Sequence, residues 1–488
     1  MHIVMVATEI SPAAKVGGLA DVISGLAKEL MSQGHQVEVM LPMYHSMRYD
    51  LISQLHEVYN ELWVPNFNEW EPEQVFSGHV EGVPCFFFTG RGRFHRSSIY
   101  GYDDDLFRFV HFSRAVMEFL LKTGRKPDIL HCHDWHTGLV PVLLYDLYAK
   151  EGMDRTRVVY TLHNIEHQGL CFYGDRLLAS VGLPLAPYFR FDRLRDHHQH
   201  GAVNLMKGGI VYSNSVTTVS PTYLQEIRTP IGGRGLDATL NAHAGKLVGI
   251  LNGIDYKIWN PGTDPLLALD YTAEAFDRKF ANKDALRERL GLLNEYRPVL
   301  ACISRLVHQK GVHLIRYAIQ HTLSRGGQFV LLGNGPDVAV QREFHRVGEE
   351  LASRRQSAIR LEQDEELAHL IYAGADMLLV PSLFEPCGLT QLIALRYGTV
   401  PLVRKTGGLA DTVFDVDSSG KEPDGVNGYA FNDPDTGGVA SVINRACEAW
   451  FYRGEFFSRI AQNGMRADHS WGPAAREYLR IYDHVRVK

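Results

Sequence analysis

The sequence has no long apolar run, no excess of charge and no paired cysteine motif. No stretch of about 18 apolar residues occurs, so no membrane span is expected. The 50 basic and 56 acidic residues leave a net charge of −6, which does not indicate a surface for nucleic acid or anionic membrane. The six cysteines form no CxxC pair, as is typical of a reduced intracellular protein. Residues 1–7 lack the pattern of a secretory signal, so a cytoplasmic location is expected.

Several motifs of cofactor and metal chemistry are also missing. No G-x-G-x-x-G follows the first strand-like run and no G-x-x-x-x-G-K-[ST] occurs, which disfavours NAD-binding and P-loop NTPase functions. The histidine-rich clusters 131–136 and 196–200 match no standard zinc spacing. The acidic triplet 103–105 directly precedes a helical pattern over 106–121, so helix N-capping explains it better than a metal does. We therefore expect no functional metal.

What the sequence does contain is a regular alternation of strand-like and helix-period runs, which predicts an α/β fold with parallel sheets. A chain of 488 residues is also too long for one ordinary core. Strand-like runs lie at 2–7, 37–41, 129–132, 158–162, 216–219 and 248–251, and again at 298–304, 328–332, 377–381 and 400–403. We predict two α/β domains, 1–255 and 256–470, followed by a helical segment over 471–488.

Polar residues follow many of these runs directly. Asp134, with Trp135 and His136, comes after the run at 129–132, His163 after that at 158–162, and Asn252 after that at 248–251. In open α/β sheets ligands bind beyond the carboxyl ends of the strands. This placement favours a binding function, although a lone histidine is more often structural.

A glycine turn follows the first strand-like run. Gly17 and Gly18 would let backbone N–H groups approach an anion at the start of a helix, and Lys15 would add a positive charge. The alternative is a turn required only by strand–helix geometry. The stretch 15–22 is echoed at 405–412, which indicates either duplicated halves or reuse of a favourable turn.

Two further groups lie at strand ends in the second half. Arg305 and Lys310 could hold a diphosphate and neutralise the charge that develops as it leaves, although a solvated basic loop is the commoner case. Glu385 lies next to a helix predicted to start at Gly388, where a carboxylate is stabilised. The Glu385 carboxylate could bind and stabilise a sugar, or it could only cap the helix. Cys387 lacks the neighbouring groups that would activate its thiol as a nucleophile.

Taken in order, these segments resemble the bacterial glycogen synthase and plant starch synthase family over essentially the whole chain. The matching motifs are Lys15-Val-Gly-Gly-Leu-Ala-Asp, His133-Asp-Trp-His, Thr161-Leu-His-Asn-Ile, Asn252-Gly-Ile-Asp, Ser304-Arg-Leu, Gln309-Lys-Gly, Phe384-Glu-Pro-Cys-Gly-Leu-Thr-Gln-Leu, Thr406-Gly-Gly-Leu-Ala-Asp-Thr and Ser470-Trp-Gly. Each motif is weak alone, and the ordered set is specific.

The resemblance implies two Rossmann-like domains facing across a cleft (the GT-B architecture), with a C-terminal helix returning to the first domain. It implies metal-independent, retaining transfer of glucose from ADP-glucose to the non-reducing end of an α-1,4-glucan. The implied catalytic residues are Glu385, His163, Lys310, Arg305 and Asp134, and the implied donor-binding residues are Lys15, Gly17, Gly18, Asp21, Asn252, Cys387, Gly388, Leu389 and Thr390.

One position departs from the family pattern. Many bacterial relatives carry an aromatic residue that stacks on adenine where this chain has Gln363, so a stacking contribution of roughly 1–3 kcal/mol is missing. ADP-glucose is expected, and UDP-glucose or dual use stays open. A sucrose- or trehalose-type synthase, a phosphorolytic glucan enzyme and a silent glucan-binding protein are competing hypotheses for the function.

Overall fold

The computed structural model describes residues 1–487, which form two compact units. Unit 1 is Met1–Gly253 together with the chain from Trp471 onward, and unit 2 is Ile254–Ser470. The observed boundary lies two residues before the predicted one. The reason is local: the Ile254 N–H donates to the carbonyl of His469 at 2.8 Å, and Ile254 pairs with Ser470 in a short parallel bridge. The chain therefore enters and leaves unit 2 at the same place.

Unit 1 is built on one nine-stranded sheet. Its strand order is β11 (Leu247–Gly249), β10 (Ser215–Thr218), β7 (Arg157–Leu162), β6 (Ile129–His133), β1 (His2–Val6), β2 (Gln36–Pro42), β5 (Val83–Phe88), β4 (Glu69–Val80) and β3 (Ile52–Asn66). The strands from β11 to β5 pair in parallel, and β4 and β3 add an antiparallel hairpin at the edge. The parallel strands read as continuous apolar runs because both faces of such a sheet are covered.

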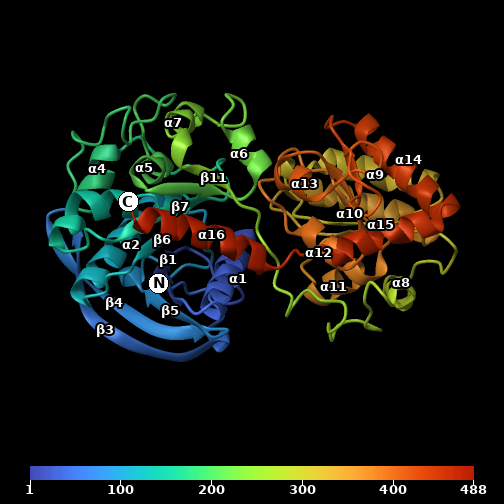
Figure 1. Ribbon diagram of the computed structural model, residues 1–488, viewed down its shortest axis with the longest axis horizontal. Helices are drawn as coiled ribbons and strands as arrows, with labels where there is room; N and C mark the ends of the chain where they lie inside the picture. Colours follow the sequence, from blue (N-terminus) through green and yellow to red (C-terminus); the bar gives the residue numbers. More distant parts are fainter. Residues whose placement is uncertain (488) are drawn as a thin grey trace. The chain divides into compact units, whose positions relative to one another are not determined.

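Helices cover this sheet, and the returning helix α16 is one of them. The helices are α1 (Gly18–Ser32), α2 (Asp105–Lys122), α3 (Val140–Leu143), α4 (Gly174–Ala179), α5 (Leu205–Tyr212), α6 (Pro221–Ile227), α7 (Asp237–Ala242) and α16 (Trp471–Arg486), and β8 (Leu170–Cys171) pairs with β9 (Val203–Asn204). In Figure 1, α16 runs beside α1 and across β6 and β7. Its Trp471 packs so tightly on α1 that a Cβ at Gly25 would lie 1.9 Å from the indole nitrogen.

Unit 2 contains a six-stranded sheet in which every pairing is parallel. The order is β14 (Ser357–Arg360), β13 (Gln328–Leu332), β12 (Val299–Ile303), β15 (Met377–Val380), β16 (Val400–Arg404) and β17 (Tyr429–Phe431). Alternate residues of each strand face opposite sides of the sheet. Thus Leu300 and Cys302 pack in one core, and Val299 and Ala301 pack in the other.

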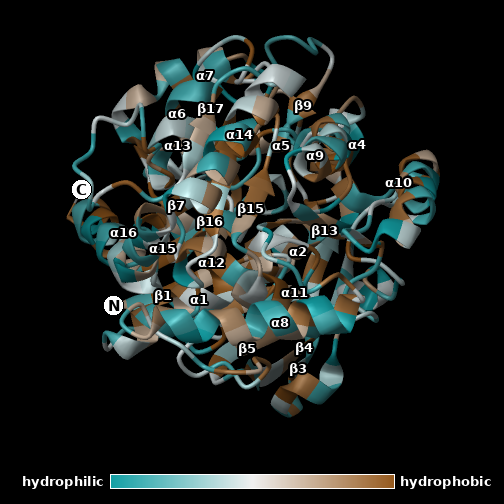
Figure 2. Cartoon of the chain, turned by 90° about the vertical axis from the view of Figure 1, so that its right-hand side faces the viewer, coloured by the Kyte–Doolittle hydropathy of each residue, from teal (hydrophilic) through white to brown (hydrophobic). Residues whose placement is uncertain are grey.

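Two helical layers complete these cores. The helices are α8 (Lys279–Leu290), α9 (Val312–Ser324), α10 (Val338–Leu351), α11 (Glu365–Gly374), α12 (Thr390–Arg396), α13 (Gly407–Thr412), α14 (Thr436–Tyr452) and α15 (Gly454–Arg466). Helices α9 and α14 pack on one face, and α8 and α11 on the other. In Figure 2 the outer helix α8 is largely teal and strand β15 is brown, which matches a polar surface over a fully buried strand.

The predicted N-capping role of the acidic triplet 103–105 was wrong in detail. Asp104 stands at the N-cap of α2, but its side chain makes no capping bond and pairs with Arg96 at 2.8 Å. Asp105 instead accepts hydrogen bonds from the N–H groups of Gly101 and Tyr102, so it shapes the preceding turn.

None of the helices within residues 1–487 combines the length and apolar character needed to cross a bilayer.

Candidate functional site

Three predicted site segments of unit 1 follow neighbouring strands. Strands β7, β6 and β1 are adjacent and parallel. His163 follows β7, Asp134 follows β6, and the loop with Lys15 follows β1. The carboxyl ends of parallel strands meet at one edge of the sheet, which is the usual position for a ligand. These residues follow strands as predicted, and their roles stay predictions.

The glycine turn after β1 already binds an anion from its own chain. The Glu9 carboxylate accepts hydrogen bonds through Oε2 from the N–H groups of Val16 at 2.7 Å and Gly17 at 2.9 Å. The Tyr100 hydroxyl donates to its Oε1 at 2.7 Å. Burial raises the pKa of Glu9, and these three bonds oppose that effect. The N–H groups of this turn do point at a carboxyl group, but the Gly17 amide is occupied by Glu9 rather than open to a ligand.

The remaining groups of this turn stay accessible. Lys15 is exposed, and its Nζ lies 2.6 Å from the Asp21 carboxylate on the first turns of α1. Gly17 is the N-cap of α1 and Gly18 is its first residue. An exposed ion pair contributes little to stability, so Lys15 can exchange Asp21 for an incoming phosphate at small cost.

Asp134 occupies a strained and buried position. Its φ of +55° lies in a region that residues with a Cβ rarely adopt. Its Oδ1 accepts the His163 N–H at 2.7 Å, which ties the end of β6 to the end of β7. Burial raises the pKa of this carboxyl to about 7. Strain and a perturbed pKa at a strand end are typical of functional positions.

His163 belongs to a cluster of three histidines. Its Nε2 lies 3.0 Å from Nδ1 of His133, and the His133 ring is tilted by 38° to that of His131, with a centroid separation of 4.1 Å. Tyr482 of α16 contacts Nδ1 of His131 at 2.8 Å. Burial lowers the pKa of His163 to about 3. The imidazole is therefore neutral at physiological pH, and its orientation is fixed by a bond to His133.

Asn252 follows β11 and has an unused acceptor. Its Oδ1 is buried and has no hydrogen-bond partner within residues 1–487. A buried polar atom without a partner costs about 1–3 kcal/mol. Such an atom at the carboxyl end of a strand fits a residue that bonds to a ligand.

In unit 2 the structure brings Lys310 and Glu385 into contact. Strands β12 and β15 are neighbours, and the loops that follow them carry these two residues. Lys310 Nζ lies 2.5 Å from Glu385 Oε2, and Ser382 Oγ donates to the same oxygen at 2.8 Å. Glu385 is buried, so its charge is balanced by a cation within its own unit.

Arg305 lies in the same loop region but is left without an acidic partner. It is exposed at the end of β12, and no ion pair involves it among residues 1–487. The neighbouring Gln309 donates to the Phe384 carbonyl at 3.1 Å, which joins the two loops. Arg305 thus presents a guanidinium without an ion-pair partner in the loop that also carries Lys310, and two cations in one loop can hold an anion.

The loop after Glu385 differs from the prediction. Helix α12 begins at Thr390, with Leu389 at its N-cap, so Cys387 and Gly388 precede the helix. Gly388 has a φ of +76°, which favours glycine and explains why the helix cannot start there. Cys387 is buried and is not part of a disulfide within residues 1–487.

The second copy of the glycine turn supports this loop. The Gly408 N–H donates to the carbonyls of Glu385 at 3.2 Å and Pro386 at 3.1 Å. A Cβ on Gly408 would lie 2.1 Å from the Cys387 carbonyl oxygen. The first copy binds the Glu9 side chain and the second binds the Glu385 backbone, so both turns use their N–H groups toward the residues after a strand.

Gln363 lies at a strand end, and the clustered histidines contact other protein groups. Gln363 is exposed after β14, at the carboxyl ends of the strands of the unit 2 sheet.

Within residues 1–487, no three or more His, Cys, Asp or Glu side chains are grouped so as to hold a metal ion. His131 and His133 share a strand face, as their spacing predicted, but they bond to protein groups.

Two residues of this site were missed in the sequence. Glu9 follows β1 at the position where ligands bind, and that position was the available signal. His133 precedes Asp134 and gave no separate signal, because its contact with His163 spans two strands. Only the strand order brings them together.

Comparison with known proteins assigns both units. The family model "Starch synthase catalytic domain" matches residues 2–242, and "Glycosyl transferases group 1" matches residues 283–464. The protein named glycogen synthase 1 of Nitrosococcus oceani is 49% identical over 100% of both chains. Glycogen synthase 2 of Methylococcus capsulatus is 47% identical over 99% of this chain and 100% of its own.

Comparison with solved structures leads to the same family. The catalytic domain of starch synthase IV from Arabidopsis thaliana, described as bound to ADP and acarbose, has a TM-score of 0.95 and 45% identity, covering 100% of this chain and 99% of its own. Sucrose-phosphate synthase of Thermosynechococcus elongatus has a TM-score of 0.61 at 18% identity over 99% of both chains, which shows a shared fold only. The chain belongs to the glycogen synthase and starch synthase family of glucosyltransferases, with two Rossmann-like domains in the GT-B architecture.

Proposed function

We propose that this enzyme transfers glucose from ADP-glucose to the non-reducing end of an α-1,4-glucan with retention of configuration. The observation that carries the proposal is the Lys310–Glu385 pair, together with Arg305 in the loop that carries Lys310. It puts cations suited to a diphosphate next to a carboxylate suited to a sugar. The starch synthase IV domain described as bound to ADP and acarbose supports the choice of donor and acceptor.

Unit 2 supplies the groups for the leaving diphosphate. Arg305 and Lys310 neutralise the charge that grows on it, and Thr390 with the Cys387–Gly388 backbone supports the phosphates and glucose. In the free enzyme Lys310 is engaged by Glu385 at 2.5 Å. Both groups are thereby held in place before the donor binds, so little reorganisation is needed during the reaction.

Unit 1 supplies groups for the diphosphate, glucose and acceptor. Lys15 exchanges Asp21 for phosphate, and the Gly18 amide adds a donor at the start of α1. Neutral His163 and the free Oδ1 of Asn252 bond to glucose hydroxyls. Asp134, with Trp135 and His136 beside it, lines the sugar and acceptor side.

The reaction is a front-face substitution. The bond from the glucose anomeric carbon to the phosphate oxygen breaks, and a bond to the acceptor 4-hydroxyl oxygen forms on the same face. The hydroxyl proton passes to the departing phosphate oxygen, so no protein nucleophile is consumed. Glu385 stabilises the positive charge on the anomeric carbon, and Arg305 and Lys310 stabilise the diphosphate. We propose that no metal is needed; this and the cytoplasmic location stay predictions from the sequence.

The decisive experiment compares radiolabelled ADP-glucose and UDP-glucose as donors for glycogen. We expect incorporation from ADP-glucose, with a weak preference over UDP-glucose because Gln363 offers no aromatic ring for the adenine. Equal or greater incorporation from UDP-glucose would reverse the donor assignment, and no incorporation from either would reject the function.

The Glu385→Ala variant tests the site in the same assay. We expect kcat to fall about 100- to 1000-fold, with little change in ADP affinity, because the carboxylate acts mainly in the transition state. ADP affinity is measured by calorimetry, which also shows that the variant is folded. Near-normal turnover would show that the catalytic centre is misplaced.

A further inference from the structure

Unit 2 has a pocket at the end of its sheet that is opposite the proposed reaction groups. Its lining includes Tyr296, Asp376 and Gly398, which precede β12, β15 and β16. Arg305 and Glu385, by contrast, follow the carboxyl ends of β12 and β15. The pocket therefore lies at the amino ends of the strands, and the proposed function gives it no role.

Aromatic rings form the walls of the pocket. Tyr296 is 77% exposed and Phe280 is 54% exposed, and they stand with Trp450 among the lining residues. The rings of Tyr296 and Trp450 have centroids 4.7 Å apart at 41° to each other. Exposed aromatic side chains are costly to leave in water, and such surfaces mark binding sites.

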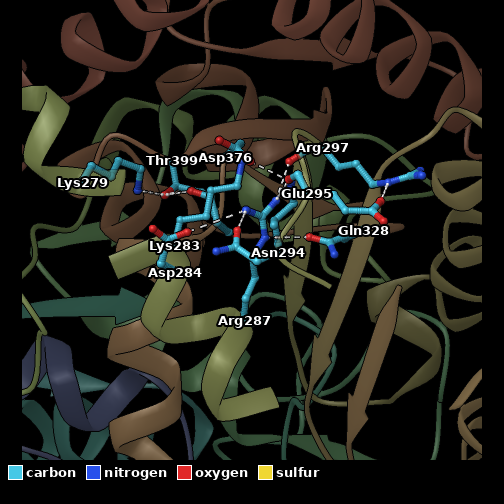
Figure 3. Close-up of polar contacts among 12 residues, drawn as sticks. Lys279, Lys283, Asp284, Arg287, Asn294, Glu295, Arg297, Gln328, Asp376 and Thr399 are labelled. Atoms are coloured by element: carbon cyan, nitrogen blue, oxygen red, sulfur yellow. Dashed lines mark hydrogen bonds and ion pairs between the residues drawn. The ribbon is translucent and has the colours of Figure 1, made fainter. Parts of the chain in front are cut away.

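The polar part of the pocket is a buried ion pair. Lys283 Nζ lies 2.6 Å from Asp376 Oδ2 and 4.7 Å from the centre of the Trp450 ring. The same Oδ2 accepts the Val299 N–H at 2.7 Å. Because both contacts use Oδ2, Oδ1 keeps its capacity to accept hydrogen bonds from a ligand. Figure 3 shows Lys283 and Asp376 together, with Lys279 to one side.

The charges in this pocket disfavour an anionic ligand. Lys283 is balanced by Asp376. Lys279 Nζ is already bonded to the carbonyls of Tyr372, Ala373 and Tyr397 and to the Thr399 hydroxyl, at 2.7–3.1 Å. Neither lysine of the lining is therefore available for a phosphate group. A purely apolar ligand is also disfavoured, because it would cover the Lys283–Asp376 pair without bonding to it.

A neutral pyranose ring satisfies both parts of the pocket. Its C–H faces are apolar and pack on aromatic rings, and the hydroxyls at its rim both donate and accept hydrogen bonds. We propose that this pocket is a second carbohydrate site, which holds a glucosyl residue of the α-glucan away from the reaction groups. The choice of glucan rests on the proposed function. Holding the polymer at a second point raises the effective concentration of its chain ends.

The test uses a double variant, Phe280→Ala with Tyr296→Ala, and direct binding without donor. Both side chains are largely exposed, so their removal should leave the fold intact, and the thermal midpoint checks this. In affinity electrophoresis through gels containing glycogen, we expect apparent affinity to fall about three- to tenfold. The matched control is Tyr452→Ala, an 83% exposed aromatic on α14 outside the pocket lining, and it should bind like the parent enzyme.

Kinetics provide a second readout. The double variant should show a similar rise in KM for glycogen, with unchanged kcat and unchanged KM for maltotetraose, which is too short to reach a distant site. Equal glycogen retardation by the parent and the double variant would overturn this site while leaving the transferase function standing. An enzyme inactive with every nucleotide-glucose that still lost glycogen retardation in the double variant would reject the function and support the site.

Discussion

Arg305 and Lys310 are both cations at the end of β12, but they start from different states. Lys310 is already paired with Glu385, whereas Arg305 is exposed and has no acidic partner within residues 1–487. Arg305 therefore has no internal ion pair to break before it binds an anion. Its guanidinium can also bond two phosphate oxygens at once.

Replacing Arg305 should reduce turnover strongly. We expect Arg305→Ala to raise the barrier by about 2–4 kcal/mol, because a cation that stabilises the leaving group acts mainly in the transition state. Steady-state kinetics with ADP-glucose and glycogen measure the effect. The control is Arg354→Ala, which removes another exposed arginine of unit 2, and its turnover should be near normal. Equal activity of the two variants would show that Arg305 is not part of the site.

Asp134 should make stability depend on pH in a defined direction. Its pKa is raised to about 7 in the folded protein, against about 3.9 in an unfolded chain. The folded state therefore binds the proton more tightly, and stability falls as the pH rises from about 4 to 7 by at most about 1.4 kcal/mol per pH unit.

The Asp134→Asn variant isolates this effect. Asparagine keeps an oxygen for the His163 N–H but does not titrate. We expect the thermal midpoint of the variant, relative to that of the parent enzyme, to increase as the pH rises through this window. Above about pH 8 the difference between the two midpoints should stay constant. A constant difference between the two proteins would mean that Asp134 is not perturbed.

At the scale of single residues, the sequence predicted positions better than partners. Lys15, Asp134 and His163 lie at strand ends as expected, since hydrophobic runs identify strands. The Glu9 bond to the glycine turn was not predictable in the same way. It depends on the exact path of the loop over seven or eight residues, which hydrophobic periodicity does not encode.

At the scale of elements, the two glycine turns follow parallel strands but meet different demands. A Cβ at Gly17 would have open space, whereas one at Gly407, the matching position, would lie 2.0 Å from the Glu385 carbonyl oxygen. Glycine is therefore required by packing in the second turn. This distinction is invisible in the matching sequences.

Gly408→Ala should damage the site through its backbone. The added methyl must displace the loop that carries Glu385, at a cost of about 1–3 kcal/mol. We expect a lower thermal midpoint and at least a tenfold loss of kcat. Gly245→Ala adds a methyl where nothing lies within 4 Å and should change neither quantity; normal kcat in Gly408→Ala would show that the loop tolerates the shift.

At the scale of the whole molecule, α16 joins parts of the chain that are far apart in sequence. Its Tyr482 bonds to His131, 351 residues earlier. The order of strands and helices could be predicted from alternating patterns, and the family resemblance implied that this helix returns to unit 1. The boundary at Gly253 could not be fixed from composition, because it depends on Ile254 meeting His469 and Ser470.

Tyr482→Phe tests how far that bond stabilises unit 1. Removing the hydroxyl leaves the buried Nδ1 of His131 without its partner, at a cost of about 1–3 kcal/mol. We expect a thermal midpoint lower by several degrees. Tyr452→Phe, on an exposed side chain, serves as the control; equal midpoints for Tyr482→Phe and the parent would mean that the bond contributes nothing.

The return of the chain to unit 1 has a consequence for biosynthesis. A ribosome releases residues 1–253 first, then all of unit 2, and only afterwards the segment that starts at Trp471. At about 5–20 residues per second, the early part waits for roughly 10 to 40 s. Throughout that interval the surface of α1 around Gly25, which Trp471 later covers, stays open to chaperones. Unit 1 is thus the first unit to be synthesised but the last to be completed.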